Sequence, residues 1–315
     1  MRILITGGAG FIASHVADAY VAAGHDVAIL DNLSRGSRNN VNAKARFYHG
    51  DIQDAQFMES VFQKERPEVI NHHAAQMDVR RGVREPLFDA SVNILGSLNI
   101  LQCAVAHGIR RIIYVSTAGA AYGEPKQVPV PEDYPINPIT PYGITKHTVE
   151  HYLFTYGVLY GLNYVVLRYG NVYGPRQSSE GEAGVFAIFC EQMLAGTQSV
   201  IYGDGTKIRD YVYIDDVAQA NLAAIQRGDG EIFNIASGEE TTDQEVFDLV
   251  RELLGKTDVH PRYMPRRPGE IDRICLEIGK AKRLLNWTPE VSLRQGAGET
   301  IKYFQEAAKH KEMVL

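Results

Sequence analysis

A tyrosine and a lysine four residues apart could carry acid–base chemistry in this chain. Tyr142 and Lys146 stand in segment 141–146, and on a helix this spacing places the phenol and the ammonium on one face. A nearby positive charge favours the phenolate and lowers the pKa of a tyrosine from about 10. Such a tyrosine can take a proton from a hydroxyl group at neutral pH. The alternative is an aromatic ring packed under the lysine stem, which the 17 tyrosines of the chain make a serious rival.

A glycine-rich turn near the start of the chain could hold a dinucleotide. Gly7, Gly10 and the small residue Ala13 lie between a strand-like run and the first helical pattern. Glycine permits a tight turn and a close approach of the backbone to a pyrophosphate, and the helix N-terminus offers free N–H groups. A bound dinucleotide would accept a hydride. Together with Tyr142 and Lys146, this turn predicts redox chemistry at a carbinol carbon.

Two carboxylates follow the next strands. Asp31 ends the second predicted strand, where it would accept hydrogen bonds from a ribose diol and repel a 2′-phosphate. We therefore expect NAD rather than NADP, although Arg35 and Arg38 could receive a phosphate. Asp51, after the third strand, could cap a helix at Asp54 or bind the adenine amine.

The elements that must position these residues alternate between short apolar runs and amphipathic patterns. We expect strands at 2–6, 26–30, 46–49, 68–72, 111–115 and 164–168, and helices at 11–23, 55–64, 87–107 and 142–160. Buried strands that alternate with helices are typical of an α/β fold, a Rossmann-type doubly wound parallel sheet with ligands beyond the carboxyl ends of the strands.

The pattern changes after Tyr169. Segment 170–184 reads as a loop, followed by a helix at 185–195, a strand at 200–202, a helix at 215–227, a strand at 231–236, and helices at 243–254, 279–285 and 293–308. We predict a Rossmann domain at 1–169, to which 210–236 returns, and a smaller, discontinuous α/β substrate domain at 170–209 and 237–315.

Composition sets further limits. The 315 residues carry a net charge of −6, which gives no general attraction for nucleic acid or anionic membranes. Cys103, Cys190 and Cys275 lack the spacing of a metal site and are expected to be reduced. We find no signal-peptide pattern and no apolar run of about 18 residues. These features predict a cytoplasmic protein with no metal, nucleic-acid or membrane partner.

Many motifs occur in an order that resembles the extended short-chain dehydrogenases/reductases, specifically the nucleotide-sugar epimerase/dehydratase group. The resemblance runs from Met1 to about Phe304. Besides the turn and the Tyr142–Lys146 pair, it rests on segments 31–34, 50–52, 72–76, 115–117, 122–123, 167–175, 209–212, 266–270 and 285–289, and on Asn93.

The resemblance implies roles for individual residues. Tyr142 is the base that removes the sugar O4 proton, and Lys146 lowers its pKa and hydrogen-bonds the nicotinamide ribose. The family's hydroxyl residue beside the tyrosine falls on Ala118 here, so we expect Thr117 to replace it, with Ser116 or a water molecule as alternatives.

The implied binding residues form two sets. The NAD site comprises Gly7, Gly10, Phe11, Ile12, Asp31, Asn32, Ser34, Gly36, Asp51, Ile52, Ala74, Ala75, Gln76, Asn93, Ser116, Tyr142, Lys146 and Tyr169. The substrate site comprises Thr117, Tyr142, Asn171, Val185, Val200, Tyr202, Arg209 and Arg267. Val200 and Tyr202 would flank the uracil, and the two arginines would bind the diphosphate unless they form surface ion pairs.

The expected reaction is reversible C4 epimerisation of a UDP-hexose (UDP-glucose/UDP-galactose) through a 4-keto intermediate and transient NADH. A dehydratase or decarboxylase is the nearest rival, but Gly119 and Ala120 stand where dehydratases carry Asp-Glu. The sugar-side gate should fall near Ile274 and Cys275, which leaves N-acetylated or uronic sugars open, UDP-GlcNAc and UDP-glucuronate among them. A non-catalytic NAD sensor is the hypothesis from another class.

The resemblance also favours a homodimer formed through a four-helix bundle. Val149, Leu153 and Tyr156 in the helix at 142–160 could belong to the core or to that interface.

Overall fold

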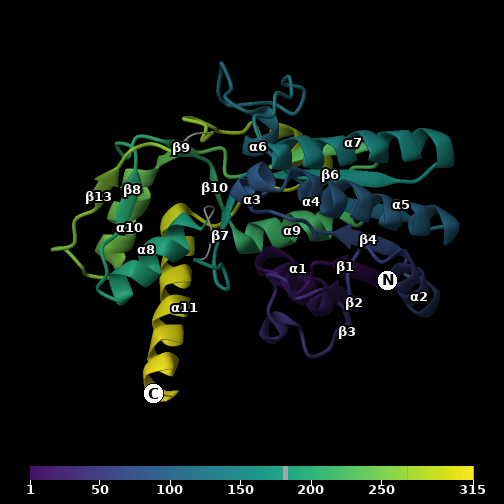
Figure 1. The fold of residues 1–315 in the computed structure, drawn as a ribbon, viewed down its shortest axis with the longest axis horizontal. Helices are drawn as coiled ribbons and strands as arrows, with labels where there is room; N and C mark the ends of the chain where they lie inside the picture. The colour runs from purple at the N-terminus through teal and green to yellow at the C-terminus, as the bar shows by residue number, and fades with distance from the viewer. Residues whose placement is uncertain (180–183, 268, 315) are drawn as a thin grey trace.

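A seven-stranded parallel sheet forms the centre of the molecule (Figure 1). The computed structural model describes residues 1–179, 184–267 and 269–314. Its strand order is β11-β6-β5-β4-β1-β2-β3. The bounds are β1 Arg2–Thr6, β2 Asp26–Asp31, β3 Arg46–His49, β4 Val69–His72, β5 Arg111–Thr117, β6 Tyr164–Tyr169 and β11 Glu231–Ile235. The predicted Rossmann-type fold is confirmed.

The sheet is buried on both faces, which explains the continuous apolar runs in its strands. Ile3, Leu4 and Ile5 of β1 are almost fully buried. Ile3 and Ile5 belong to the apolar cluster on one face, and Leu4 to the cluster on the other. The strand order reverses between β1 and β4, so a crevice forms beyond their carboxyl ends.

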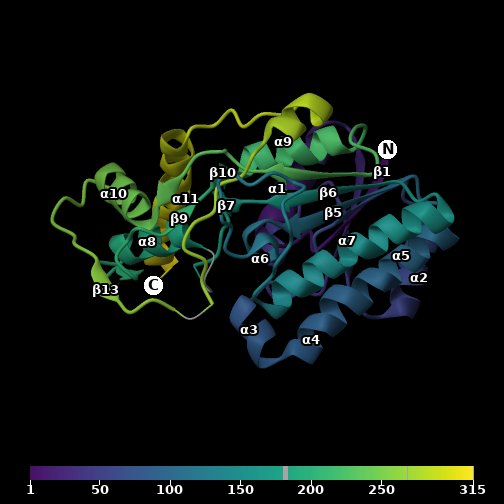
Figure 2. The same ribbon diagram turned by 90° about the horizontal axis from the view of Figure 1, so that it is seen from above.

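Helices cover the sheet in two layers, which Figure 2 shows edge-on. On one face α1 (Phe11–Ala22) packs against α9 (Ile214–Ala224). On the other face lie α2 (Ala55–Glu65), α5 (Gly96–Ala106) and α7 (Pro141–Tyr160). The carboxyl ends of the strands therefore lie between these two helix layers.

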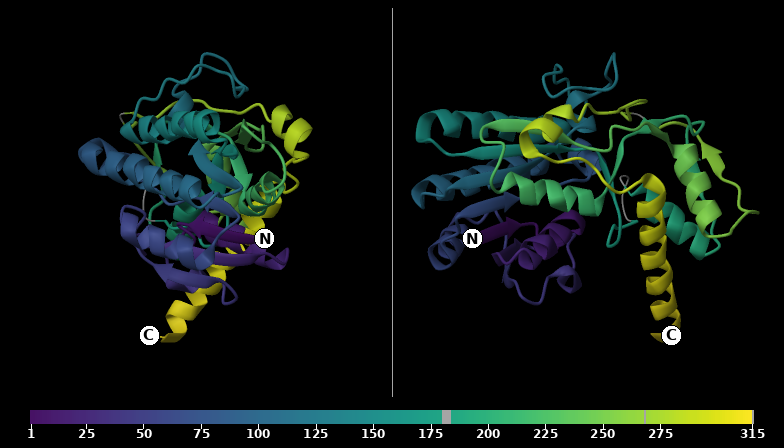
Figure 3. Two further views of the ribbon diagram at one scale, coloured as in Figure 1. Left: turned by 90° about the vertical axis from the view of Figure 1, so that its right-hand side faces the viewer. Right: turned by 180° about the vertical axis from the view of Figure 1, so that it is seen from behind.

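A smaller group of elements lies beyond the carboxyl ends of the strands (Figure 3). It contains α8 (Val185–Leu194), α10 (Asp243–Leu253) and α11 (Leu293–Val314). Three two-stranded sheets accompany them: β7 (Asn171–Tyr173) with β10 (Tyr211–Tyr213), β9 (Ile208–Arg209) with β12 (Thr241–Thr242), and β8 (Val200–Tyr202) with β13 (Arg262–Met264). Between β10 and β12 the chain returns to the large sheet to form α9 and β11.

Several elements differ from the sequence expectation. The helix expected at 87–107 is divided into α4 (Pro86–Ala90), a π-helical turn (Ser91–Leu95) and α5, and α3 (Val79–Arg84) precedes it. The helix expected at 279–285 is a π-helical turn at Ala281–Leu285. The loop expected at 170–184 contains β7, and its residues 180–183 lie outside the described part, as does Pro268 of the motif at 266–270.

One helical stretch, Pro86–Ala106, is long and apolar enough by length and composition to cross a membrane. Its α4 and α5 portions pack against α7, and α5 also packs against α2. This packing accounts for its apolar composition as a helix of the layer over the sheet.

Candidate active site

The turn between β1 and α1 can approach a pyrophosphate closely. Gly7 has φ +72°, and a Cβ there would lie 2.8 Å from the backbone nitrogen of Ala74, so only glycine fits. Gly10 precedes α1 in an extended conformation and supplies no side-chain cap. The first N–H groups of α1, including those of Phe11 and Ile12, therefore have no partner within the helix and can serve a phosphate.

Asp31 ties this turn to the second strand. Its carboxylate accepts hydrogen bonds from the backbone N–H of Ala9 at 3.0 Å and of Leu33 at 2.7 Å. Burial raises the pKa of Asp31. Arg35 forms an ion pair with Asp78 at 3.6 Å, and the Arg38 guanidinium lies over the Phe47 ring. Asp31 thus stands where the sequence placed it, and both neighbouring arginines already have partners.

Asp51 does not cap α2. The N-cap is Asp54, which accepts from the backbone N–H groups of Gln56 and Phe57. Asp51 instead accepts from the backbone N–H of Gln53 at 2.9 Å, in the turn before α2, and from the side-chain amide of Asn32 at 2.8 Å. The cap interpretation of Asp51 is therefore wrong, and its carboxylate stays at the carboxyl end of the sheet beside Asn32.

Other expected cofactor residues surround the same edge. Gly36 lies so close to the turn that a Cβ would be 2.9 Å from the carbonyl carbon of Ala9. The backbone N–H of Ser34 donates to Asn32. Ile52 is buried in the apolar core, and Ala74 and Ala75 follow β4 after His73. The glycines, the free N–H groups and these acceptors fit a dinucleotide.

Tyr142 and Lys146 lie in the first two turns of α7. The Thr140 side chain caps this helix by accepting from the Gly143 N–H, and Pro141 occupies its first position, where proline is favoured. Lys146 is only 3% exposed, and its ammonium lies 4.2 Å from the centroid of the Tyr114 ring. The expected helical pair is therefore present, with the lysine inside the protein.

The pKa expected for Tyr142 is not found. Burial raises the pKa of Tyr142, and the negative charge of Asp89 raises it further. Burial also lowers the pKa of Lys146 to about 7, against the opposing effect of Glu150 and Asp89. The prediction of a lowered tyrosine pKa is therefore wrong, because burial and the charge of Asp89 both disfavour the phenolate.

The end of β5 carries two hydroxyl groups before Ala118. The Ser116 hydroxyl donates to Glu150 at 2.5 Å and is buried. Thr117 is partly exposed, and within the described residues no hydrogen bond is recorded for its hydroxyl. Successive strand residues face opposite sides of the sheet. Thr117 therefore has the freer hydroxyl of the two, while Ala118 is fully buried.

The buried carboxylate of Asp89 was missed in the sequence. It accepts from the Thr145 hydroxyl at 2.7 Å, from the Gln76 amide at 2.8 Å and from the Asn93 amide at 3.3 Å. Gln76 and Asn93, both expected to bind cofactor, thus hold this carboxylate. An acidic residue four positions before Asn93, in an otherwise apolar helical pattern, was the available signal.

Tyr169 ends β6 and is almost fully buried. Its hydroxyl accepts from the Asn221 amide at 2.7 Å, and its ring centroid lies 6.4 Å from that of His73. The tyrosine thus lines the sheet edge beside His73 with its hydroxyl turned to α9.

The expected substrate residues come from the smaller group of elements. Tyr202 lies in β8, and the Arg267 guanidinium is 3.4 Å from its ring centroid, a cation–π contact. Arg209 in β9 donates to the backbone carbonyls of Ile208 and Ile271. Val200 starts β8, Val185 starts α8 and Asn171 starts β7. These residues are therefore spread over β7, α8, β8, β9 and the segment after β13.

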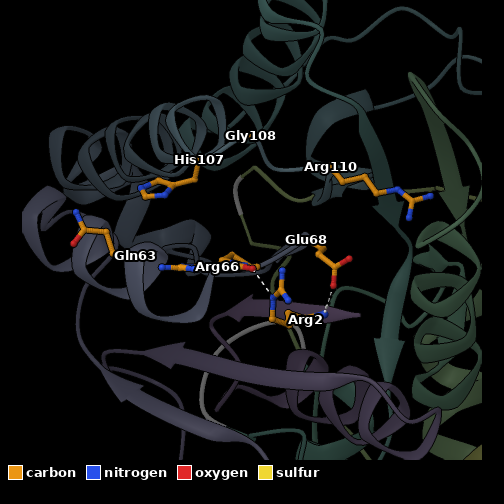
Figure 4. A pocket seen from close by; sticks show the side chains of 8 residues that line it. Arg2, Gln63, Arg66, Glu68, His107, Gly108 and Arg110 are labelled. Carbon is orange, nitrogen blue, oxygen red and sulfur yellow. Dashed lines mark hydrogen bonds between the residues drawn. The ribbon is translucent and has the colours of Figure 1, made fainter.

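A cavity of about 740 Å³ lies away from all of these residues (Figure 4). Arg2, Glu68 and Arg110, which stand at the amino ends of β1, β4 and β5, line it. The backbone N–H of Arg2 donates to Glu68 inside it. Because the turn and the Tyr142–Lys146 pair lie at the carboxyl ends, this cavity is not the candidate active site.

Comparison with known proteins gives consistent matches. A family model described as the NAD dependent epimerase/dehydratase family matches residues 3–236. A putative UDP-glucose 4-epimerase of Methanocaldococcus jannaschii is 45% identical, covering 96% of this chain and 98% of that protein. The UDP-glucose 4-epimerase of Thermotoga maritima, solved with UDP-glucose, has a TM-score of 0.96 at 48% identity, covering 98% and 100% of the two chains. The Thermus thermophilus enzyme, solved with NAD, has a TM-score of 0.93 at 41% identity and the same coverage.

Proposed function

Because the chain belongs to the NAD-dependent epimerase/dehydratase family, we propose that it catalyses the reversible C4 epimerisation of a UDP-hexose, which interconverts UDP-glucose and UDP-galactose. The cofactor is NAD. The observation that carries the proposal is the position of Tyr142 and the buried Lys146 at the start of α7. The positive charge of Lys146 acts on His73. The next residue, Ala74, lies against Gly7 of the glycine-rich turn. The Tyr142–Lys146 pair and the glycine-rich turn therefore meet at the end of β4.

Tyr142 carries the proton chemistry of this reaction. Bound NAD supplies the acceptor that takes a hydride from C4 and the donor that returns it. Tyr142 removes the O4 proton as the carbinol is oxidised and gives it back when the 4-keto sugar is reduced from its other face. The protonated form of Lys146 supplies the positive charge that favours the phenolate. The proton stays at the tyrosine during the cycle, so no external acid or base is needed.

The substrate is held mainly by its nucleotide. The sugar must turn between oxidation and reduction, so binding energy has to come from the uridine and the diphosphate. Tyr202 and Val200 provide an aromatic and an aliphatic surface on β8 for the base. Arg209 and Arg267 provide guanidinium groups that suit phosphate oxygens.

A dehydratase on the same scaffold is a weaker candidate. That reaction needs acid–base carboxylates next to the sugar, and the turn after β5 carries Gly119 and Ala120 at the start of α6 (Gly119–Tyr122). Neither residue can transfer a proton, which favours the epimerase.

The proposal is tested with purified protein and a panel of UDP-, dTDP- and GDP-hexoses, with product configuration read by NMR. We expect C4 inversion of UDP-galactose and no loss of water. Tyr142→Phe should lower kcat by roughly 10²- to 10⁴-fold while NAD stays bound. Tyr156→Phe, further along α7, is the matched control. Unchanged turnover in Tyr142→Phe would instead support a non-catalytic NAD-binding protein.

The sugar acceptance of the enzyme extends the proposal. Ile274 is buried in a small apolar cluster with Ala118 and Tyr122, and Cys275 beside it is also buried. Neither is a bulky aromatic, which supports some activity on UDP-GlcNAc. The same panel tests this extension, and no C4 inversion of UDP-GlcNAc would refute it.

We also infer a homodimer in the cytoplasm. Four large apolar side chains are largely exposed on neighbouring helices: Leu87 and Leu95 of the stretch Pro86–Ala106, and Phe154 and Val158 of α7. An apolar face of this kind supports pairing with a second subunit. The three buried free cysteines are compatible with a reducing compartment. Interconversion of UDP-glucose and UDP-galactose would give the enzyme a place in galactose metabolism.

A further inference from the structure

Asp89 joins three elements that each carry part of the candidate site. Its carboxylate is fully buried in α4. The Thr145 hydroxyl reaches it from α7, the Asn93 amide from the π-helical turn, and the Gln76 amide from the segment after β4. Figure 2 shows α4 beside α7 in the same layer.

These bonds reach residues that the reaction needs. Thr145 directly precedes Lys146, and its hydroxyl also contacts the carbonyl oxygen of Tyr142 at 3.1 Å. The Gln76 backbone N–H donates to the Asn93 side chain at 2.8 Å, and the Asn93 amide donates to the Thr145 hydroxyl at 3.0 Å. The carboxylate therefore closes a network between the coenzyme segment and the catalytic helix.

The carboxylate is held by hydrogen bonds rather than by an ion pair. Among residues 1–179, 184–267 and 269–314, no ion pair is recorded between Asp89 and a lysine, arginine or histidine. Burial of a carboxylate costs several kcal/mol unless hydrogen bonds or charges compensate for it, and here the donors on Thr145, Gln76 and Asn93 supply that compensation. An asparagine of nearly the same shape would present an NH2 group to the same donors. The network is therefore built for a side chain that only accepts hydrogen bonds.

We propose that Asp89 is a positioning residue of the epimerase, which fixes the first turns of α7 to the coenzyme segment and sets a negative charge against the Tyr142–Lys146 pair. This role rests on the proposed function. It adds a residue that touches neither substrate nor cofactor and acts through Thr145 and Lys146.

The charges around Lys146 single out Asp89. Glu150, from α7 itself, also faces the ammonium but is paired with the Arg168 guanidinium at 2.6 Å. His72 and His73, from the end of β4, face it as well.

Both histidines are neutral at working pH. Burial lowers the pKa of His73 to about 3 and holds the pKa of His72 well below its usual value. The Tyr114 hydroxyl on β5 is likewise neutral, because burial raises its pKa. Among the residues described, Asp89 is therefore a negative charge near the pair that is not engaged in an ion pair, whereas Glu150 is.

The charge of Asp89 raises the pKa of both Lys146 and Tyr142. Without it, Lys146 would lose its proton at lower pH. Because burial holds the pKa of Lys146 at about 7, the alkaline limb of the pH profile of kcat lies within the measured range and should move in the acid direction.

The experiment measures kcat for UDP-galactose from pH 5 to 9 at saturating substrate with NAD-loaded enzyme. Asp89→Asn should show the acid shift together with a loss of about tenfold or more at the wild-type optimum. Thr145→Val keeps the charge and removes the shortest of the three bonds to Asp89, so it should lose kcat without the shift. Glu85→Gln, which removes an exposed charge just before α4, is the matched control and should follow the wild type.

Thr145→Val also covers the case in which Asp89→Asn does not fold, because it leaves the carboxylate in place and removes only the hydrogen bond from α7.

Two results would overturn the role of Asp89: an unshifted profile in active Asp89→Asn, or unchanged kcat in Thr145→Val. If Asp89→Asn does not fold, wild-type kcat in Thr145→Val would still refute positioning. A wild-type protein with no turnover of any UDP-hexose would refute the proposed function instead, so the two failures are distinguishable.

Discussion

The carboxylate of Glu150 lies 2.6 Å from the guanidinium of Arg168, and the two side chains are 2% and 3% exposed. The pair links α7 to β6 beneath the candidate active site, and the Ser116 hydroxyl joins it from β5. Removal of one partner from a buried pair leaves an uncompensated charge. This ion pair should therefore support the fold and the catalytic helix together.

Glu150→Gln should lower the free energy of unfolding by about 3–5 kcal/mol at pH 7. Burial would raise the pKa of Glu150, but hydrogen bonds from His147, Arg168 and Ser116 outweigh it and lower the pKa to about 2. A depressed folded-state pKa contributes stability above the unfolded value of about 4.5 and loses it as the pH falls toward 2.

Urea unfolding of wild type and Glu150→Gln at several pH values measures this effect. The stability difference should be full at pH 7 and should shrink as the pH falls below about 4.5. Glu306→Gln, exposed on α11, should show no such trend. A difference that stays constant down to pH 3 would show that the charge of Glu150 is not what stabilises the fold.

Gly7→Ala should damage both folding and coenzyme binding. The new Cβ would lie 2.8 Å from the Ala74 nitrogen at φ +72°. Gly24→Ala is the matched control, since Gly24 has φ +81° with nothing within 4 Å of the added carbon. The control should lose about 1–2 kcal/mol of stability from backbone strain alone.

Calorimetric titration with NAD and thermal unfolding separate the two glycine variants. Gly7→Ala should lose more stability than Gly24→Ala and at least tenfold in NAD affinity. Equal losses in the two variants would mean that the close approach to Ala74 is unimportant.

Thr117→Val should lower kcat by about 10²-fold. Among the described residues the Thr117 hydroxyl has no recorded hydrogen bond, so it can bond the sugar O4. It would then replace the family's hydroxyl residue, whose position is Ala118 in this chain. Ser116→Ala should cost about 1 kcal/mol of stability instead, since the Ser116 hydroxyl serves Glu150. Steady-state kinetics and unfolding on both variants decide between them. A larger fall in kcat for Ser116→Ala would assign the hydroxyl role to Ser116.

Asp31→Ser should raise the affinity for NADP relative to NAD by about tenfold. The carboxylate ends β2 and repels a 2′-phosphate, and the serine removes that charge. Titrations with both coenzymes measure the ratio. Asp51→Asn, at the same edge of the sheet, is the matched control and should leave the ratio of NADP to NAD affinity unchanged. An unaltered ratio in Asp31→Ser would mean that Asp31 does not select NAD over NADP.

The chain of 35.0 kDa should scatter light as a particle of about 70 kDa, twice its own mass. Val149 and Leu153 are buried in the core, so the interface should use Phe154 and Val158 instead. Phe154→Glu with Val158→Glu should give a monomer. Leu284→Glu, an exposed leucine in the π-helical turn after β13, should not change the mass. A monomeric wild type would contradict the prediction.

The large sheet was predictable from sequence because most of its strands are short apolar runs buried on both faces, although the edge strand β3 is partly exposed. β1 and β3 begin and end where the sequence placed them. β7, β9, β10, β12 and β13 were missed, since strands of two or three residues carry little periodicity, although β8, also of three residues, was predicted. The break at Ser91–Leu95 was missed because it depends on contacts of Asn93 with residues distant in the chain.

The candidate site was predictable in its residue types and less so in its electrostatics. The pair in α7 and the turn at Gly7 follow from local spacing. The raised pKa of Tyr142 and the lowered pKa of Lys146 depend on burial by other elements, which spacing does not report. Asp89 is bonded by Thr145, 56 residues away, and Glu150 by Arg168, 18 residues away, so their roles required the folded chain.

The return of the chain from β10 through α9 and β11 has a consequence for dissection of this protein. No single cut separates a coenzyme-binding fragment from the rest, because a piece ending near residue 170 would lack the edge strand and the helix that covers α1. The Asp210 carboxylate is a further link between distant segments. It accepts hydrogen bonds from the backbone N–H groups of Ser237, Gly238 and Leu276. The large sheet with its helices and the smaller group of elements are therefore connected by several chain crossings and should unfold as one unit.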